Sequence, residues 1–277
     1  MGALLAVAAA LAYGTSDFAA GVASRRLSAG PVTVTVQACG LLAAGIAVLL
    51  FPGSGPTSSA LGWGAASGIG SAVGTLSLYQ GLSAGPMSVV ATVSSVLTAV
   101  IPAVTGVALG NRLSVLAGTG IGIAVLATGL ISWQRDTGEG RRVRAGLGYG
   151  VLAGMGFALL LISLDRAGTH AGAWPLIPGQ AVALLLVSPF GRGIREMREH
   201  RRPAALTIGA GVLGGSANLV YLAATGRGEL AIVAVLTAMY PAVTVLLARF
   251  CLAERWTRLQ AAGLITAAAA VVLLRVG

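Results

Sequence analysis

Charged side chains are scarce in this sequence. They make up 9 % of its 277 residues, whereas apolar residues make up 56 % and the mean hydropathy is +0.88. A soluble domain carries about 25 % charged residues, and so few charges cannot cover the surface of a soluble fold of this size. The composition therefore excludes a soluble globular domain, a disordered chain, a coiled coil and a disulfide scaffold.

Lysine is absent, and all 18 basic residues are arginine. The arginines lie between apolar runs, so we interpret them as boundary charges and expect no nucleic-acid binding. The two cysteines, Cys39 and Cys251, lie far apart, and His170 and His200 stand alone in polar stretches. This spacing fits no zinc site, and we expect neither a metal nor a cofactor.

Long apolar runs account for most of the chain. A helix that crosses the hydrocarbon of a membrane needs about 20 residues, and ten such runs leave only short connections. We therefore predict an all-α integral membrane protein of the cytoplasmic membrane with ten transmembrane helices. The ten runs are 2–23, 31–51, 60–82, 86–109, 114–133, 146–165, 172–190, 203–224, 229–250 and 257–275.

The two halves of the chain resemble each other. A shift of 143 residues aligns Gln37 with Gln180, and residues 111–114 with residues 254–257. Each half has five spans, so the second half enters the membrane from the opposite side, as in the inverted repeats of many secondary transporters. The predicted organisation is a first five-helix repeat, a polar linker and a second five-helix repeat, at residues 1–134, 135–144 and 145–277.

Two motifs resemble the EamA-type branch of the drug/metabolite transporter superfamily. They are Tyr-Gly-Thr-Ser-Asp-Phe at residues 13–18 and Leu-Ala-Glu-Arg-Trp-Thr at residues 252–257. The family usually has a glutamate at this place in both halves. Here the second half has Glu254, whereas the first half has Asn111, so Glu254 and Asn111 are not equivalent ion-binding groups. The resemblance implies ten helices in two EamA repeats and the export or exchange of small metabolites.

Asp17 is the only acidic residue well inside a predicted span. A charge at membrane depth costs about 2.5–3.5 kcal/mol on insertion scales, so such a carboxyl can bind and release a proton or pair with a substrate ammonium. Alternatively, Asp17 follows Gly14 and caps a broken helix by accepting backbone N–H bonds. Tyr13 shares a helix face with Asp17 and either lines a polar cavity or anchors the helix at the interface.

Other polar residues within the spans are candidates for substrate contact or for hydrogen bonds between helices. Pro241, after Tyr240, resembles the family's proline in the fourth helix of a repeat and is a candidate gating hinge, whose counterpart in the first half is Thr98. The predicted substrate-binding residues are Tyr13, Asp17, Gln37, Tyr79, Gln80, Gln180, Asn218 and Tyr221. Asp17 is also the predicted proton-coupling residue.

These features predict a secondary active transporter for a small polar metabolite, an amino acid or a related compound. We expect export by proton exchange, with alternating access between the repeats. The alternative is uptake or facilitated diffusion of a sugar or a drug-like solute. With 5 % aromatic residues, an aromatic cage for a quaternary ammonium is disfavoured. One acid within the spans does not suit an intramembrane enzyme. We expect a substrate, a proton and the lipid bilayer as partners, and a monomer or a homodimer.

The arginines also predict an orientation. Arg112, Arg166, Arg227 and Arg275 fall on the N-terminal side of the membrane, and the other 14 fall on the opposite side. Because short loops rich in arginine stay in the cytoplasm, this bias places the linker inside and both termini outside. The family resemblance implies the reverse orientation.

Overall fold

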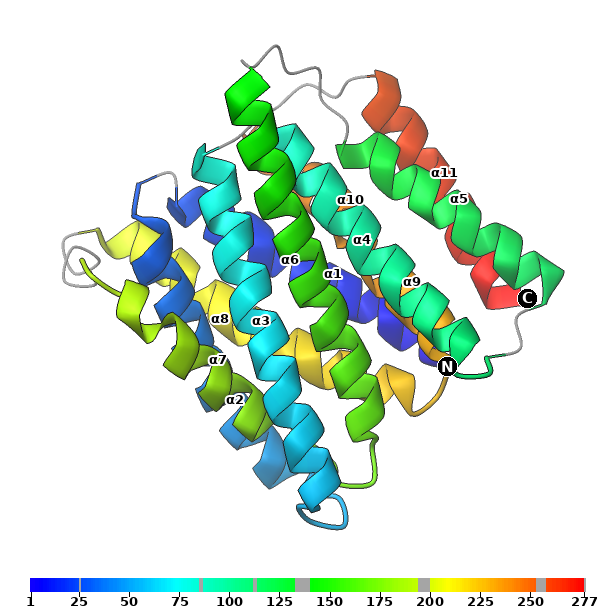
Figure 1. Ribbon diagram of the computed structural model, residues 1–277, viewed down its shortest axis with the longest axis horizontal. Helices are drawn as coiled ribbons and strands as arrows, with labels where there is room; N and C mark the ends of the chain where they lie inside the picture. Colours follow the sequence, from blue (N-terminus) through cyan, green and yellow to red (C-terminus); the bar gives the residue numbers. More distant parts are fainter. Residues whose placement is uncertain are drawn as a thin grey trace.

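The computed structural model describes residues 1–24, 26–84, 87–111, 114–132, 140–193, 200–252 and 258–276. Within these residues the regular structure is helical (Figure 1). The helices are α1 (Gly2–Ser24), α2 (Ala29–Leu50), α3 (Ser58–Ala84), α4 (Met87–Ala108), α5 (Val115–Ser132), α6 (Gly140–Ala167), α7 (Leu176–Val187), the 3-10 helix η1 (Ser188–Phe190), α8 (Arg201–Thr225), α9 (Leu230–Thr237), α10 (Tyr240–Leu252) and α11 (Arg258–Val276).

The helices follow the apolar runs of the sequence closely, and the all-α membrane fold is confirmed. The seventh span begins late, because residues 168–175 form turns in which Gly168 and Gly172 have positive φ angles. The ninth span is divided into α9 and α10 by a turn at Ala238 and Met239. Among the described helices, α1, α2, α8 and the Arg144–Ala167 part of α6 are each long and apolar enough to cross a membrane. Shorter apolar helical segments lie in α4, α5, α7 with η1, α9 with α10, and α11.

The two halves repeat each other at the level of helix boundaries. The helices α3, α4 and α5 begin at residues 58, 87 and 115, and α8, α9 and α11 begin at residues 201, 230 and 258, in each case 143 residues later. Packing between the halves is reciprocal, since α1 packs on α8 and α6 packs on α3. The helices α5 and α11 pair along one edge of the bundle (Figure 1). The fold is therefore two inverted five-helix repeats, while the exact linker boundaries remain a prediction.

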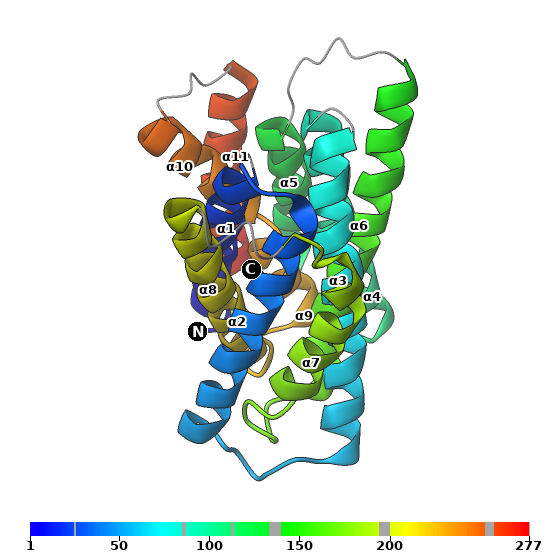
Figure 2. The same ribbon diagram turned by 90° about the vertical axis from the view of Figure 1, so that its left-hand side faces the viewer.

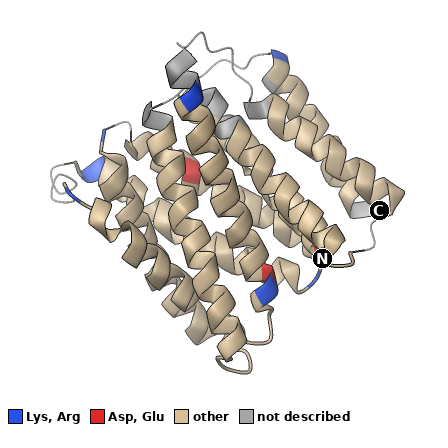
Figure 3. Cartoon of the chain, in the orientation of Figure 1, with Lys and Arg blue, Asp and Glu red and all other residues tan. Residues whose placement is uncertain are grey.

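The end of α5 and the start of α6 lie at one end of the bundle, and the loop after α2 lies at the other (Figure 2). At the latter end, the Ser54 N–H donates to the carbonyl of His170 at 2.9 Å, so the loops after α2 and α6 lie together. Figure 3 shows arginines near the helix ends and in the connections. Charge is thus concentrated at the two faces that meet water and headgroups.

Small residues fill the interior and larger apolar ones face outward. Ala9 and Ala234 are fully buried, whereas the side chains of Leu42 and Ile265 are 71 % and 74 % exposed. Without a hydrophobic driving force in lipid, helices associate by close backbone packing, which small residues permit. The glycines differ in this respect. Gly70 and Gly74 of α3 contact α6 closely, whereas a Cβ added at Gly118 or Gly122 of α5 would meet nothing within 4 Å.

Candidate functional site

A cavity lies between the two repeats at the middle of the bundle. Its volume is about 70 Å³, several times the roughly 10–15 Å³ that one water molecule needs. Every α-helix except α5 and α11 contributes described residues to its wall. Phe157, Leu160 and Leu161 of α6 give it an apolar side, and polar residues of the other helices occupy its ends. Such a mixture of apolar wall and few polar groups is typical of small-molecule sites.

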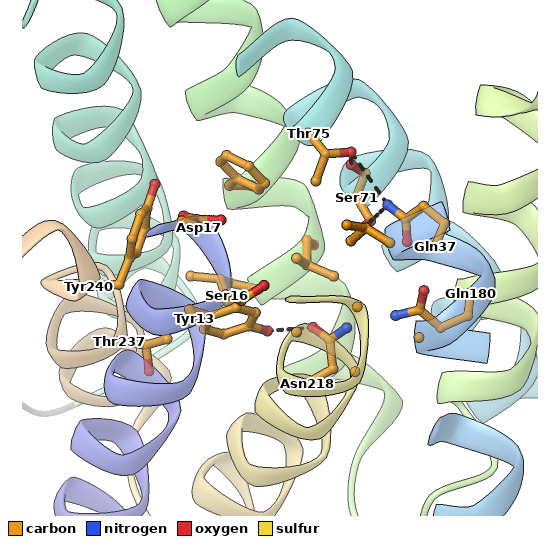
Figure 4. A pocket seen from close by; sticks show the side chains of 18 of the residues that line it. Tyr13, Ser16, Asp17, Gln37, Ser71, Thr75, Gln180, Asn218, Thr237 and Tyr240 are labelled. Atoms are coloured by element: carbon orange, nitrogen blue, oxygen red, sulfur yellow. Dashed lines mark hydrogen bonds between the residues drawn. The ribbon is translucent and has the colours of Figure 1, made fainter. Parts of the chain in front are cut away.

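One end of the cavity holds a carboxyl group among phenols, and we call it the tyrosine–carboxylate end. It consists of Asp17 with Tyr13, Tyr79 and Tyr240, and all three rings are close enough to interact electrostatically with the carboxyl. Figure 4 shows Tyr240 beside Asp17. The helix α1 runs without a break from Gly2 to Ser24, so Asp17 lies in a helix interior and does not cap a broken helix.

The other end carries the two glutamines of the matched positions, and we call it the amide end. The Gln37 Nε2 donates to Ser71 Oγ at 3.0 Å and to Thr75 Oγ1 at 3.3 Å. Gln180 faces Gln37 across this end (Figure 4), and its Oε1 is buried without a hydrogen-bond partner in the described structure. Both side chains face the interior and not lipid, with exposures of 3 % and 5 %.

Asn218 of α8 lies between the two ends. Its Oδ1 accepts a hydrogen bond from the Tyr13 hydroxyl (Figure 4), so α1 is tied to α8 across the cavity. Nearby, the Ser16 hydroxyl donates to the carbonyl of Ala210 at 2.8 Å. These bonds fix the face that α1 presents to the cavity, and with it the position of Asp17.

The structure brings most of the predicted site residues together. Two predicted residues lie elsewhere: Tyr221 is fully buried and donates to the Leu161 carbonyl at 3.1 Å, and Gln80 is not part of the cavity wall. Tyr221 therefore serves to hold α8 on α6. The predicted residues that line the cavity are Tyr13, Asp17, Gln37, Tyr79, Gln180 and Asn218.

Sequence reasoning missed several hydroxyl-bearing residues of the wall. Ser71 and Thr75 precede Tyr79 at intervals of four residues, a spacing that puts all three on one helix face. That pattern would have identified them. No comparable signal marks the remaining ones, which are Ser16, Thr98, Thr237 and Tyr240.

The break between α9 and α10 borders the cavity. Thr237 and Tyr240, on either side of the turn, both line it. Pro241 has no N–H and cannot donate to the Thr237 carbonyl four residues earlier. In the first repeat, α4 continues through the equivalent Thr98, so the break is asymmetric. The gating role of Pro241 remains a prediction.

The polar motif at the end of the fourth helix has a structural role in the first repeat. The Asn111 Oδ1 accepts the Ala231 N–H at 3.3 Å, close to the start of α9. Its counterpart Glu254 lies outside the described residues. No group of three or more potential metal ligands occurs in the described part of the chain.

Comparisons with known proteins identify the second repeat directly. Residues 144–276 match the EamA-like transporter family. No curated protein matches the chain. Among solved structures, one described as "Crystal structure of protein" is 15 % identical with a TM-score of 0.77, over 99 % of this chain and 96 % of that chain. That likeness supports the fold alone. The second repeat is therefore similar to the EamA-like transporter family, and this match together with the apolar helices indicates a multi-pass membrane protein of the transporter type.

Proposed function

We propose that the protein exports a small polar metabolite carrying an ammonium group, an amino acid or a related compound, in exchange for protons across the cytoplasmic membrane. The observation that carries this proposal is the tyrosine–carboxylate end, which lies in the cavity between the two repeats. In inverted-repeat transporters, a site in this position is exposed alternately to the two sides of the membrane.

The chemistry of this end suits an organic cation. A carboxylate pairs with an ammonium, and the faces of aromatic rings attract cations. Asp17 has Tyr13, Tyr79 and Tyr240 around it. Overall aromatic content was a poor guide here, because three of the five tyrosines of the chain gather at this one place. A neutral sugar has no need of such a carboxylate, so we favour an amine over the alternative substrates.

Proton exchange follows from the cost of a charge at membrane depth. An isolated carboxylate in a span costs about 2.5–3.5 kcal/mol on insertion scales. Either a bound proton or a bound substrate cation removes this cost at Asp17. The proton and the substrate cation therefore compete for one carboxylate. The transporter changes between its inward-open and outward-open states with one or the other bound. This competition couples substrate export to proton entry.

Flux measurements in liposomes test the proposal. We would reconstitute the purified protein, impose a pH gradient and follow labelled choline, a cation that does not cross lipid unaided. The wild-type protein should accumulate choline against its gradient, and Asp17→Asn should abolish the effect of pH. The matched control is Asp165→Asn, at the end of α6 and outside the cavity wall. Unchanged flux and pH dependence in Asp17→Asn would refute the proposal.

A further inference from the structure

The two matched glutamines of the amide end differ in their hydrogen bonds. Gln37 donates from Nε2 to the hydroxyls of Ser71 and Thr75. Gln180, in the equivalent position of the second repeat, is 5 % exposed, and its Oε1 has no partner among the described residues. In Figure 4 the Gln180 Nε2 is directed toward Asn218 and its Oε1 toward Gln37, and all three residues line the cavity. The repeat symmetry is therefore broken at this amide.

The hydroxyls that accept hydrogen bonds from the Gln37 Nε2 are not repeated in the second half. The residues equivalent to Ser71 and Thr75, 143 positions later, are Gly214 and Asn218. Glycine supplies no hydroxyl, and the Asn218 Oδ1 already accepts a bond from Tyr13. Both residues line the cavity, which therefore has no hydroxyl at these two positions.

A buried amide oxygen without a partner is rare in native proteins and unfavourable. A ligand that brings an O–H or N–H donor to Gln180 removes that penalty. A ligand that brings a carboxylate supplies no donor. Moreover, none of the described residues lining the cavity is an arginine or a histidine, so a substrate carboxylate would find no counter-charge there and would face the negative charge of Asp17.

We propose that Gln180 forms a second subsite that takes a neutral hydrogen-bond donor of the substrate, a hydroxyl or an amide. The substrate class is then a small organic monocation bearing such a donor, and zwitterions with a free carboxylate are rejected. This inference rests on the proposed function for the cationic group. It narrows the substrate to amines without a free carboxylate, which excludes amino acids themselves and leaves the related compounds. The cationic group of the solute then binds at the tyrosine–carboxylate end, and its neutral donor binds at the amide end.

Three quaternary ammonium compounds of similar size provide the probes. Choline carries a hydroxyl, ethyltrimethylammonium carries no donor, and glycine betaine carries a carboxylate. We would measure their affinities for the purified protein by calorimetry. Choline should bind about tenfold more tightly than ethyltrimethylammonium, the range expected for satisfying one buried acceptor. Glycine betaine should bind at least about tenfold more weakly than choline.

One variant tests the assignment of the choline preference to Gln180. Gln180→Leu removes the acceptor and should lower choline affinity to that of ethyltrimethylammonium, whose own affinity stays unchanged and shows that the cavity is intact. Asp165→Asn, at the end of α6 and outside the cavity wall, is the control and should keep the choline preference.

The outcomes separate this inference from the proposed function. Equal affinities of choline and ethyltrimethylammonium in the wild-type protein overturn the Gln180 subsite. So does a choline preference that survives in Gln180→Leu. Tight binding of glycine betaine overturns the rejection of carboxylates. The Asp17→Asn variant tests the proposed function separately. If choline and ethyltrimethylammonium both bind the wild-type protein and neither binds Asp17→Asn, the proposed function is supported whatever the outcome for Gln180. If Asp17→Asn binds both cations as the wild-type protein does, the proposed function is refuted.

Discussion

Asp17 and Leu160 occupy equivalent positions in the two repeats, 143 residues apart, and line the same cavity from α1 and α6. The two repeats therefore place equivalent backbone positions at the cavity but carry different side chains there, one acidic and one apolar. The tyrosines around Asp17 are not repeated either, since their equivalents are glycine or leucine. A symmetric scaffold thus encloses a site with one acidic end and one amide end.

The ring of Tyr240 should contribute to cation binding. Tyr240→Leu removes an aromatic face beside Asp17 and should weaken choline binding about 2- to 30-fold, corresponding to a cation–π contribution of about 0.5–2 kcal/mol. Tyr240→Phe keeps the ring and is the matched control. Calorimetry on the purified variants measures the difference. Equal affinities of the two variants would show that the ring does not contact the cation.

Close packing between α3 and α6 should make Gly156 sensitive to substitution. An added Cβ would lie 2.5 Å from the Gly74 N and 2.8 Å from the Gly70 carbonyl oxygen. Gly156→Ala should therefore destabilise the protein by about 1–3 kcal/mol and lower its thermal midpoint in detergent. Gly118→Ala, in open space on α5, should be neutral or slightly stabilising because alanine favours helix. Similar midpoints for both variants would contradict the packing argument.

The break before Pro241 should affect transport more than binding. Pro241→Ala restores an N–H that can bond to the Thr237 carbonyl and join α9 to α10. We expect choline flux to fall at least about threefold while choline affinity stays nearly constant, as for a hinge remote from the chemistry. Pro102→Ala is the control, because α4 is already continuous through Pro102. A loss of affinity in proportion to the flux would exclude a hinge role.

The orientation predicted from the arginines can be tested by cysteine labelling. Gly140→Cys, in a background without Cys39 and Cys251, should resist a membrane-impermeant thiol reagent in intact cells and react after permeabilisation. Ser59→Cys lies at the opposite end of the bundle and should react in intact cells. The reversed pattern would place both termini in the cytoplasm and show that the charge bias does not set the orientation here.

Much of the fold could be predicted because membrane helices depend on length and apolarity alone. The ten apolar runs give the helices to within a few residues. The alignment of Gln37 with Gln180 gives the repeat register that the helix starts reproduce. Asp17 could be identified as a site candidate, because a lone charge at membrane depth has few structural explanations.

The composition of the site could be predicted only in part. A helix that is apolar all round does not reveal which face it turns to its neighbours. Tyr79 lines the cavity and Tyr221 does not, although both are tyrosines near polar residues in comparable spans. The turn before Tyr240 depends on how α9 and α10 pack, which no local pattern encodes. Long-range packing, rather than propensity, decides these features.

Asp17, the one acid among the described residues that line the cavity, also sets the electrical character of the proposed cycle. Because the equivalent of Asp17 in the other repeat is Leu160, each half of the cycle carries either one proton or one monovalent cation on the same group, in opposite directions. The exchange is then one to one and electroneutral, so no net charge crosses the membrane. A pH difference drives it, and the membrane voltage neither speeds nor opposes it.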